Sequence, residues 1–288
     1  VLREAGLRPS FIIGGDVNEI GTGAAWDDGQ IFVVEADESD GSFLDLARRV
    51  AVVTNVEPDH LDYYGDFAGL RTAFRRFVEE TDGVTVVGID DEGGRRLAAG
   101  SGVVTVGTSF GATWRLESVY EAWEGVSFDL VGPGGERLPI QVPLPGLHNA
   151  RNAAVAAVTG LVVASPPEAV IDALARFGGV ARRFEHRGAA AGVEFVDDYA
   201  HLPTEVATTI HACRSGSWNR VVAVFQPHRY SRTESLATSF AEAFDGADVV
   251  YVTEVFPAGE LPRPGVTGRL VADAVRASRP GTDVRYEP

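Results

Sequence analysis

Short runs of β-branched residues alternate with helical segments along most of this chain, and this alternation restricts the possible folds more than any other feature. The runs Val50 to Val53, Val84 to Ile89 and Val103 to Val106 predict buried strands. Residues 66–80 have the apolar spacing of an amphipathic helix, and a shorter helix is expected at 95–99. Because helices that alternate with strands usually connect parallel neighbours, the pattern predicts an α/β fold with a mostly parallel sheet.

The region before residue 50 is expected to add two strands and a long polar segment. Strands are predicted at Arg8 to Gly15 and at Ile31 to Val34, with a glycine-rich loop at residues 16–30 between them. The first residues have the pattern of a helix end, which Gly6 would terminate.

The pattern changes at about residue 112. Three short strands joined by glycine and proline turns predict a small antiparallel sheet, at Trp114 to Tyr120, Gly125 to Val131 and Arg137 to Val142. Two helices are expected next, at 149–164 and 167–177, and the proline pair before the second suits a helix start.

Residues 178–183, GGVARR, predict a boundary between two α/β domains, 1–180 and 181–288. Beyond this boundary the alternation of strand and helix begins again. Strands are expected at 193–196, 221–225, 249–252 and 283–286, and helices at 204–212, 231–244 and 267–277. The second domain is therefore also predicted to be an open α/β structure.

The composition argues against several classes of partner. The formal charge of −16 opposes nonspecific binding to nucleic acid or to an anionic membrane. The single cysteine, Cys213, excludes an internal disulfide and fits a reducing, cytoplasmic compartment. No apolar run approaches the ~20 residues of a membrane-spanning helix, and no signal peptide is recognisable.

The chain contains neither lysine nor methionine, and all 25 of its basic residues are arginine. Because it also begins with Val1, we expect a segment of a longer protein that has been shortened at both ends. Any chemistry that needs a lysine amine would have to come from outside this segment.

Two acidic turns follow predicted strands, which is where parallel sheets bind ligands. The first, EADESD, begins at Glu35, and the second, TNVEPDHLD, contains Asn55 and His60. Carboxylates at a strand end suit Mg²⁺, which takes oxygen ligands and keeps several waters. The alternative for EADESD is a solvated acidic turn without a ligand. The alternative for His60 is a partially buried histidine whose hydrogen bonds are satisfied by neighbouring residues. We favour a metal site because the two acidic turns occur together.

The motif PLPGLHNARNAA joins a proline and glycine turn to the start of a predicted helix. Asn149 is expected to be the N-cap of that helix. His148 and Asn152 have no comparable structural role, and both could form hydrogen bonds to a nucleotide base.

Three polar motifs mark the second domain. Arg183 belongs to an arginine pair that could bind phosphate, although a surface pair without function is the simpler alternative. Asp198 follows a strand, where a carboxylate could bind ribose hydroxyls. FQPHRYSRT follows another strand and gathers His228, Arg229, Tyr230 and Arg232, and its two arginines could bind an anionic substrate group.

In this order, EADESDGSF, TNVEPDHLD, PLPGLHNARNAA, GGVARRFE, DDYAH and FQPHRYSRT resemble the motifs of the Mur ligases, which build the peptide of peptidoglycan precursors. The resemblance covers nearly the whole chain and is strongest to the members that join L-alanine to UDP-N-acetylmuramate. It implies a central P-loop-type ATPase domain followed by a Rossmann-like C-terminal domain. The implied reaction uses ATP and Mg²⁺: the sugar carboxylate attacks the γ-phosphate, and the amine of alanine then displaces phosphate from the acyl phosphate.

The resemblance also implies roles for the residues that match the family's motifs. The expected Mg²⁺ positions are Glu35 and His60, and the expected catalytic residues are His60, His201 and Arg229. The expected nucleotide contacts are His148, Asn149, Asn152, Arg183 and Asp198. The expected substrate contacts are Asn55, Tyr199, His201, Arg229 and Arg232.

Three departures from the family pattern limit the interpretation. The P-loop with its GKT sequence and the UDP-sugar domain are absent, so we expect no turnover from this segment alone. Leu202 stands where close relatives have a second histidine, which puts one polar contact in question. Two alternatives stay open: a Mur ligase that recycles peptides or adds a later residue, and a non-catalytic nucleotide-binding module. Whether the protein is a homo-oligomer is open too.

Overall fold

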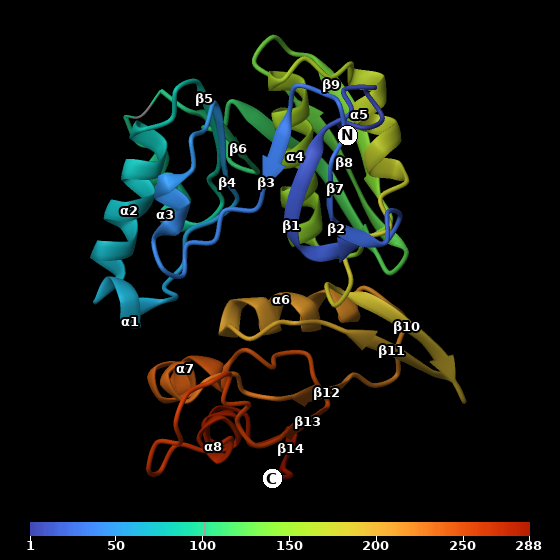
Figure 1. Ribbon diagram of the computed structural model, residues 1–288. Helices are drawn as coiled ribbons and strands as arrows, with labels where there is room; N and C mark the ends of the chain where they lie inside the picture. Colours follow the sequence, from blue (N-terminus) through green and yellow to red (C-terminus); the bar gives the residue numbers. More distant parts are fainter. Residues whose placement is uncertain (101) are drawn as a thin grey trace. The chain divides into compact units, whose positions relative to one another are not determined.

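The computed structural model describes residues 1–100 and 102–288 (Figure 1). The chain divides into two compact units, Val1–Ala181 and Arg182–Pro288, which are described separately below. Among the described residues, no helix is long and apolar enough to cross a membrane. The predicted class, a mixed α/β fold with mostly parallel and small antiparallel pairings, is confirmed.

A six-stranded sheet forms the centre of the first unit. In spatial order its strands are β4 (Val50–Val53), β5 (Val84–Gly88), β6 (Val104–Gly107), β7 (Trp114–Ala122), β8 (Gly125–Val131) and β9 (Arg137–Val142). The pairs from β4 to β7 are parallel, and the last two pairs are antiparallel. The predicted antiparallel strands are thus present, and they continue the parallel sheet instead of standing apart from it.

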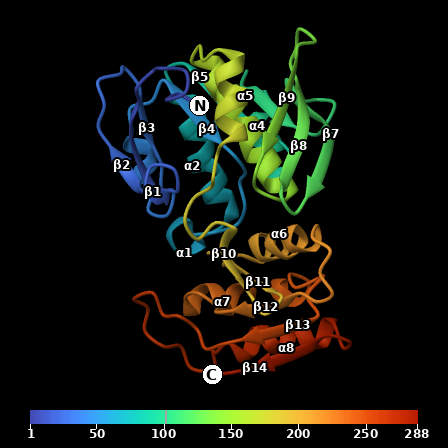
Figure 2. The same ribbon diagram turned by 90° about the vertical axis from the view of Figure 1, so that its right-hand side faces the viewer.

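Helices cover both faces of this sheet (Figures 1 and 2). The helices of the first unit are α1 (Leu61–Tyr64), α2 (Phe67–Glu79), α3 (Glu92–Ala98), α4 (Leu147–Val162) and α5 (Pro167–Ala175). Val86 packs in a core with α4, whereas its neighbour Val87 packs in a second core with α2 and the short 3₁₀ helix η1 (Ser42–Asp45). Because successive strand residues point to opposite faces, continuous apolar runs are what a sheet buried on both sides requires.

A second, three-stranded sheet lies near the N-terminus of the first unit, in the order β2 (Thr22–Ala25), β1 (Ser10–Val17), β3 (Phe32–Val34). The loop predicted at residues 16–30 is therefore wrong, since β2 pairs antiparallel with β1 inside it. The expected helix end at the N-terminus is a hydrogen-bonded turn and not a helix, but Gly6 does adopt the left-handed conformation that ends such a turn, with φ 72°.

The second unit contains a parallel sheet and a separate hairpin. The parallel strands are β12 (Val222–Phe225), β13 (Val249–Val252) and β14 (Asp283–Tyr286), in that spatial order. The hairpin pairs β10 (Glu185–Ala190) with β11 (Val193–Asp197). The helices are α6 (Pro203–Arg214), α7 (Tyr230–Leu236), the 3₁₀ helix η2 (Ala237–Ala241) and α8 (Arg269–Ser278).

Two predictions for the second unit are corrected. The strand at 193–196 exists, but it pairs with β10, which the sequence did not predict, and not with the parallel sheet. The single helix expected at 231–244 is divided into α7 and η2. Its apolar residues still reach the core, where Phe240 and Phe244 are almost completely buried.

Candidate functional site

The carboxyl ends of β4, β5 and β6 lie at one edge of the large sheet, because these strands are parallel neighbours. The predicted polar residue Asn55 follows β4 and donates to Glu57 from Nδ2 at 3.4 Å. Asp90 follows β5, and one of its oxygens accepts from both the N–H and the hydroxyl of Thr108. The other oxygen accepts from Arg151 of α4 at 2.6 Å. The sequence reading did not find this Asp90–Arg151 contact, because 61 residues separate the partners.

Glu35 follows β3 and contacts the adjacent strand β1. Its Oε2 accepts from the N–H of Gly14 at 2.6 Å. A Cβ atom at position 14 would lie 2.9 Å from Oε1, so glycine allows the carboxylate to approach the backbone this closely. Glu35 is otherwise exposed, which leaves its carboxylate accessible to a cation.

His60 lies between two carboxylates at the start of α1. Its Nε2 is 3.5 Å from Oε1 of Glu38 and 3.3 Å from Oδ2 of Asp59. The backbone of His60 is left-handed, with φ 53° and ψ 30°, which is uncommon outside glycine. These contacts are consistent with a histidine that pairs with neighbouring residues and binds no metal. Both this interpretation and the metal interpretation remain open.

No group of three or more His, Cys, Asp or Glu side chains in the described residues is arranged to hold a metal ion. This arrangement is compatible with Mg²⁺, because Mg²⁺ at phosphate sites often takes only one or two carboxylates and completes its shell with phosphate and water oxygens. The exposed carboxylate of Glu35 has the chemistry of such a ligand. Glu35 thus provides one carboxylate of the kind that Mg²⁺ takes, and the described residues do not form a complete metal site by themselves.

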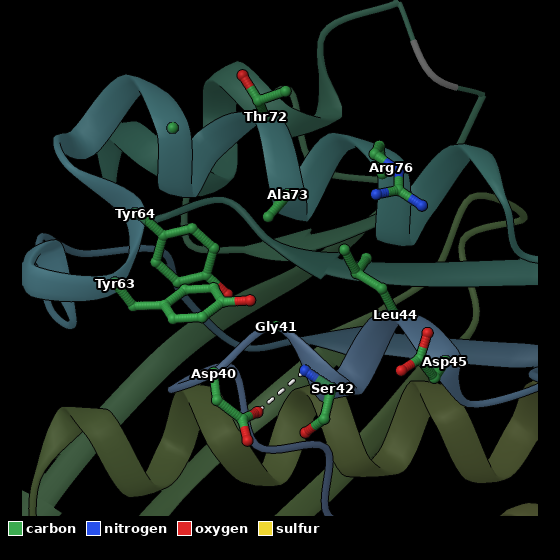
Figure 3. Close-up of a pocket in the computed structure, with 11 residues that line it drawn as sticks. Asp40, Gly41, Ser42, Leu44, Asp45, Tyr63, Tyr64, Thr72, Ala73 and Arg76 are labelled. Atoms are coloured by element: carbon green, nitrogen blue, oxygen red, sulfur yellow. Dashed lines mark hydrogen bonds between the residues drawn. The ribbon is translucent and has the colours of Figure 1, made fainter.

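A surface cavity of about 510 Å³ lies beside η1, α1 and α2 (Figure 3). Figure 3 shows the rings of Tyr63 and Tyr64 next to each other, opposite the turn in which Asp40 accepts from the N–H of Ser42. Burial, with the neighbouring acidic groups, raises the pKa of Tyr64 to about 12, so its hydroxyl stays protonated and donates to the carbonyl of Glu38. None of the predicted site residues lines this cavity.

The start of α4 differs from the prediction for Asn149. Helix α4 begins at Leu147, and Gly146, with φ 97°, occupies the N-cap position. Asn149 therefore lies inside the first turn, where its Nδ2 donates to the carbonyl of Pro145 at 2.8 Å. The N-cap interpretation is wrong because glycine adopts the required conformation without a side-chain cap.

His148 holds a buried polar atom without a hydrogen-bond partner. Its Nδ1 is one of few such side-chain atoms among the described residues. Burial, and secondarily the charge of Arg151, lowers the pKa of His148 to about 4, so the imidazole is neutral near pH 7. A buried polar atom without a partner is destabilising, so a hydrogen bond to Nδ1 from a polar ligand group would be favourable. Asn152, one turn along, is exposed.

Asp198 follows β11 in the second unit and accepts two backbone hydrogen bonds. Its Oδ2 accepts from the N–H of Phe184 at 2.9 Å and its Oδ1 from the N–H of Ala200 at 2.7 Å. Burial raises the pKa of Asp198, and the two N–H donors oppose that effect. The exposed guanidinium groups of Arg182 and Arg183 lie 4.6 and 5.8 Å from the ring centre of Tyr199.

Four rings from three segments of the second unit pack together. Tyr199 and His201 come from the turn between β11 and α6, His228 from the turn after β12, and Phe256 from the segment after β13. Ring centres are 5.3 to 5.9 Å apart, and His228 stacks on Phe256. The sequence reading noted His228 but did not assign it to the site. We call these four residues the ring cluster.

The two arginines of FQPHRYSRT are placed differently. Arg229 is half-buried and has φ 67° and ψ 138°, an unusual backbone conformation for a residue with a side chain. Arg232 is 8% exposed and is the one charged residue among the buried residues that the structure describes. Its Nη1 lies 3.0 Å from Nδ1 of His228.

The chain belongs to the Mur ligase family. Residues 18–160 match the Mur ligase middle domain, and residues 182–288 match the Mur ligase, glutamate ligase domain. It is 47% identical to a UDP-N-acetylmuramate–L-alanine ligase from Saccharopolyspora erythraea, over 99% of this chain and 60% of the relative. It is 41% identical to the enzyme of the same name from Thermobifida fusca, over 100% of this chain and 63% of the relative.

Solved structures agree with this membership. A UDP-N-acetylmuramate-alanine ligase from Thermotoga maritima has a TM-score of 0.80 and 26% identity, and the match covers 99% of this chain and 62% of that one. A murein peptide ligase from Psychrobacter arcticus has the same fold, with a TM-score of 0.66 and 21% identity, over 99% of this chain and 65% of that one. The chain spans about 60% of the length of the curated relatives described above.

Proposed function

We propose that this chain is the ATP-binding and amino-acid-binding part of a ligase that joins L-alanine to UDP-N-acetylmuramate. The observation that carries the proposal is 41–47% identity, over nearly the whole chain, to relatives that bear this enzyme's name. Residues 1–180 correspond in this proposal to a central ATPase domain and residues 181–288 to a C-terminal domain. The substrates are metabolites of the cytoplasm, where we place the enzyme.

The reaction needs two nucleophiles positioned in turn. The sugar carboxylate attacks the γ-phosphorus of ATP and releases ADP, which gives an acyl phosphate. The amine of alanine attacks the acyl carbon, phosphate leaves, and the amine loses a proton. Most of the catalysis in such a reaction comes from positioning and from charge stabilisation on phosphate oxygens. Mg²⁺, when bound, neutralises charge on those oxygens.

In the first unit, we assign Glu35 and His60 to the magnesium position, where His60 also has a catalytic role. The accessible carboxylate of Glu35 supports its part of this assignment. His148, Asn149 and Asn152 are assigned to the nucleotide base, and the partnerless Nδ1 of His148 supports this role.

In the second unit, we assign Arg183 and Asp198 to the phosphate and ribose of the nucleotide. We assign the substrate's alanyl end to four residues of this unit: Tyr199, His201, Arg229 and Arg232. Two of them, His201 and Arg229, are also assigned as catalytic residues. Asn55 of the first unit is assigned to the substrate as well. The proximity of Tyr199 and His201, whose ring centres are 5.3 Å apart, supports a shared pocket in this unit.

The test uses a completed ligase, in which the regions of the Saccharopolyspora erythraea relative that this chain does not cover are joined to it. We expect phosphate release from ATP only when both UDP-N-acetylmuramate and L-alanine are present. Glycine and the tripeptide L-alanyl-γ-D-glutamyl-meso-diaminopimelate serve as controls. Release with the tripeptide but not with alanine would move the assignment to a peptide-recycling ligase, and no release with any acceptor would contradict the ligase assignment.

A further inference from the structure

The turn after β12 places His228 at the centre of the ring cluster. Two backbone hydrogen bonds hold this turn to the segment after β13: Arg229 N–H donates to the carbonyl of Phe256, and Phe256 N–H donates to the carbonyl of Pro227, both at 2.8 Å. The ring of His228 stacks on Phe256 with 5.6 Å between ring centres. Because backbone and ring are both fixed, the two ring nitrogens point in defined directions.

Each nitrogen of His228 has a polar neighbour of known hydrogen-bonding ability. Nδ1 lies 3.0 Å from Nη1 of Arg232, and a guanidinium group can only donate. Nδ1 must therefore accept, which leaves the ring proton on Nε2. Nε2 lies 3.4 Å from the hydroxyl oxygen of Tyr199, which can accept that proton's hydrogen bond. The two contacts together select one neutral tautomer.

The charges around the ring favour this neutral state. Burial is the main reason that the pKa of His228 falls to about 4, and electrostatic interactions with Arg232, His201 and Arg229 lower this pKa further. Glu260 opposes the shift. The hydroxyl of Tyr199 also lies beside the ring, 3.4 Å from Nε2. A protonated imidazole would carry donors on both nitrogens and would direct one of them at a guanidinium group.

We propose that His228 is a positioning residue of the alanine pocket: as the Nε2–H tautomer it connects the Arg232 guanidinium to the Tyr199 hydroxyl and fixes where both side chains meet the substrate. This inference rests on the proposed function for the identity of the substrate. Its structural half, the tautomer and the two contacts, does not depend on that function.

The structural half is tested on the 288-residue chain itself, without substrate. Ring ¹⁵N chemical shifts of His228, assigned by comparison with His228→Asn, report which nitrogen carries the proton. We expect the Nε2–H tautomer, unchanged from about pH 8 to about pH 5.5, because an ordinary histidine titrates within this range. A proton on Nδ1, or titration within this range, would overturn the proposal.

The functional half uses three substitutions in the completed ligase. In His228→Asn, the side-chain oxygen lies close to the position of Nδ1 and can still accept from Arg232. In His228→Gln, the polar group lies near the position of Nε2, and His228→Phe keeps a ring on Phe256 but has no polar atom. His211→Asn, on an exposed position of α6, is the matched control.

We expect KM for L-alanine to rise roughly 10- to 100-fold in His228→Phe, since a hydrogen bond to a charged group is lost. His228→Asn should recover most of this loss, His228→Gln less, and the KM for ATP should stay unchanged. Equal alanine KM values in the Asn and Phe variants would contradict a positioning role.

If His228→Phe does not fold, the test compares His228→Asn with His228→Gln. The proposal then requires the KM for alanine to be lower in His228→Asn than in His228→Gln. If the completed ligase released no phosphate in response to alanine while the Nε2–H tautomer was still observed, the proposed function would be contradicted and the structural half of this inference would stand.

Discussion

The two units hold their proposed ligand-binding residues in different ways. In the first unit, Glu35 contacts a backbone N–H and His60 lies beside two carboxylates of its own turn. In the second unit, Tyr199 comes from the turn after β11, His228 from the turn after β12 and Arg232 from α7, and His228 contacts both of the others. One set depends on local backbone geometry, whereas the other is a packed network.

This difference predicts how much each set needs its ligand. The described residues of the first unit offer few protein ligands to a metal, so in the proposed site nucleotide phosphates would supply further oxygens. In the second unit, direct contacts among the side chains restrict their motion, which lowers the entropy that binding must remove. We therefore expect substitution of Glu35 to act on catalysis and substitution of His228 to act mainly on the affinity for alanine.

The largest effect is expected for Glu35→Gln in the completed ligase. The amide can still accept from Gly14 N–H, so the local fold should persist, but a neutral amide is a poor magnesium ligand. We expect kcat/KM for ATP to fall roughly 100-fold or more, with a higher Mg²⁺ requirement. Phosphate release measured over a series of Mg²⁺ concentrations provides both values.

Glu92→Gln is the matched control for this substitution. Glu92 pairs with Arg96 on the surface of α3, and exposed pairs of this kind contribute little to stability. Its variant should retain wild-type kinetics. If Glu35→Gln also retained them, the carboxylate would serve only to bind the Gly14 backbone, and the magnesium assignment would be wrong.

The second prediction compares the two histidines with the lowest pKa values, one in each unit. The pKa values of His148 and His228 are both lowered from 6.5 to about 4, burial being the main cause. Between these values the unfolded chain binds more protons than the folded chain. The free energy of unfolding should therefore fall as the pH is lowered from about 6.5 to about 4, and the lost stability is fully present above about 6.5.

Urea unfolding at several pH values, followed by circular dichroism, measures this slope. His148→Phe should reduce the loss of unfolding free energy between pH 6.5 and pH 4 by on the order of 2 kcal/mol. His228→Phe should reduce it by less, because the ring of His228 is more exposed to solvent, which screens the charges around it. His211→Gln controls for the loss of an exposed histidine. A steeper effect at His228 than at His148 would contradict the comparison.

The sequence predicts most of the fold, because strands with β-branched runs have a strong local pattern. β4, β8, β9, β13 and β14 begin and end where predicted. β2 was missed since its residues, TGAA, are small and carry no alternation, and β10, EHRGAA, was missed because it is polar and contains glycine. Both strands are stabilised by antiparallel partners, which local propensity does not report.

The sequence suggests which residues belong to the candidate site, but it does not predict which of them contact one another. Polar turns after predicted strands suggest Glu35, Asp198 and Arg229 as candidates without a structure, although the strand before Asp198 lies in an antiparallel hairpin. That His228 joins Tyr199 to Arg232 depends on how the turn after β12 lies against the turn after β11, 29 residues away in sequence. The N-cap of α4 was misassigned because Asn is a preferred N-cap residue, whereas the helix begins at Leu147 and Gly146 is its N-cap.

The smallest effects are expected from backbone strain, which both regions contain. His60 has φ 53° and ψ 30°, within the left-handed helical region, whereas Arg229 has φ 67° and ψ 138°, outside it. Sparsely populated conformations of this kind cost a residue with a side chain on the order of 1–3 kcal/mol each, and we expect the second to cost more than the first. Glycine adopts both with little strain.

Matched glycine and alanine variants separate this strain from the loss of the side chain, since both remove it and only alanine keeps a Cβ. Arg229→Gly should be more stable than Arg229→Ala by about 1 kcal/mol, measured as the urea midpoint of the 288-residue chain. The difference between His60→Gly and His60→Ala should be smaller. In the completed ligase, both Arg229 variants should have the same raised KM for alanine, because both lack the guanidinium group. Equal stability of the two Arg229 variants would contradict the prediction, because it would show that the backbone conformation of Arg229 is not strained.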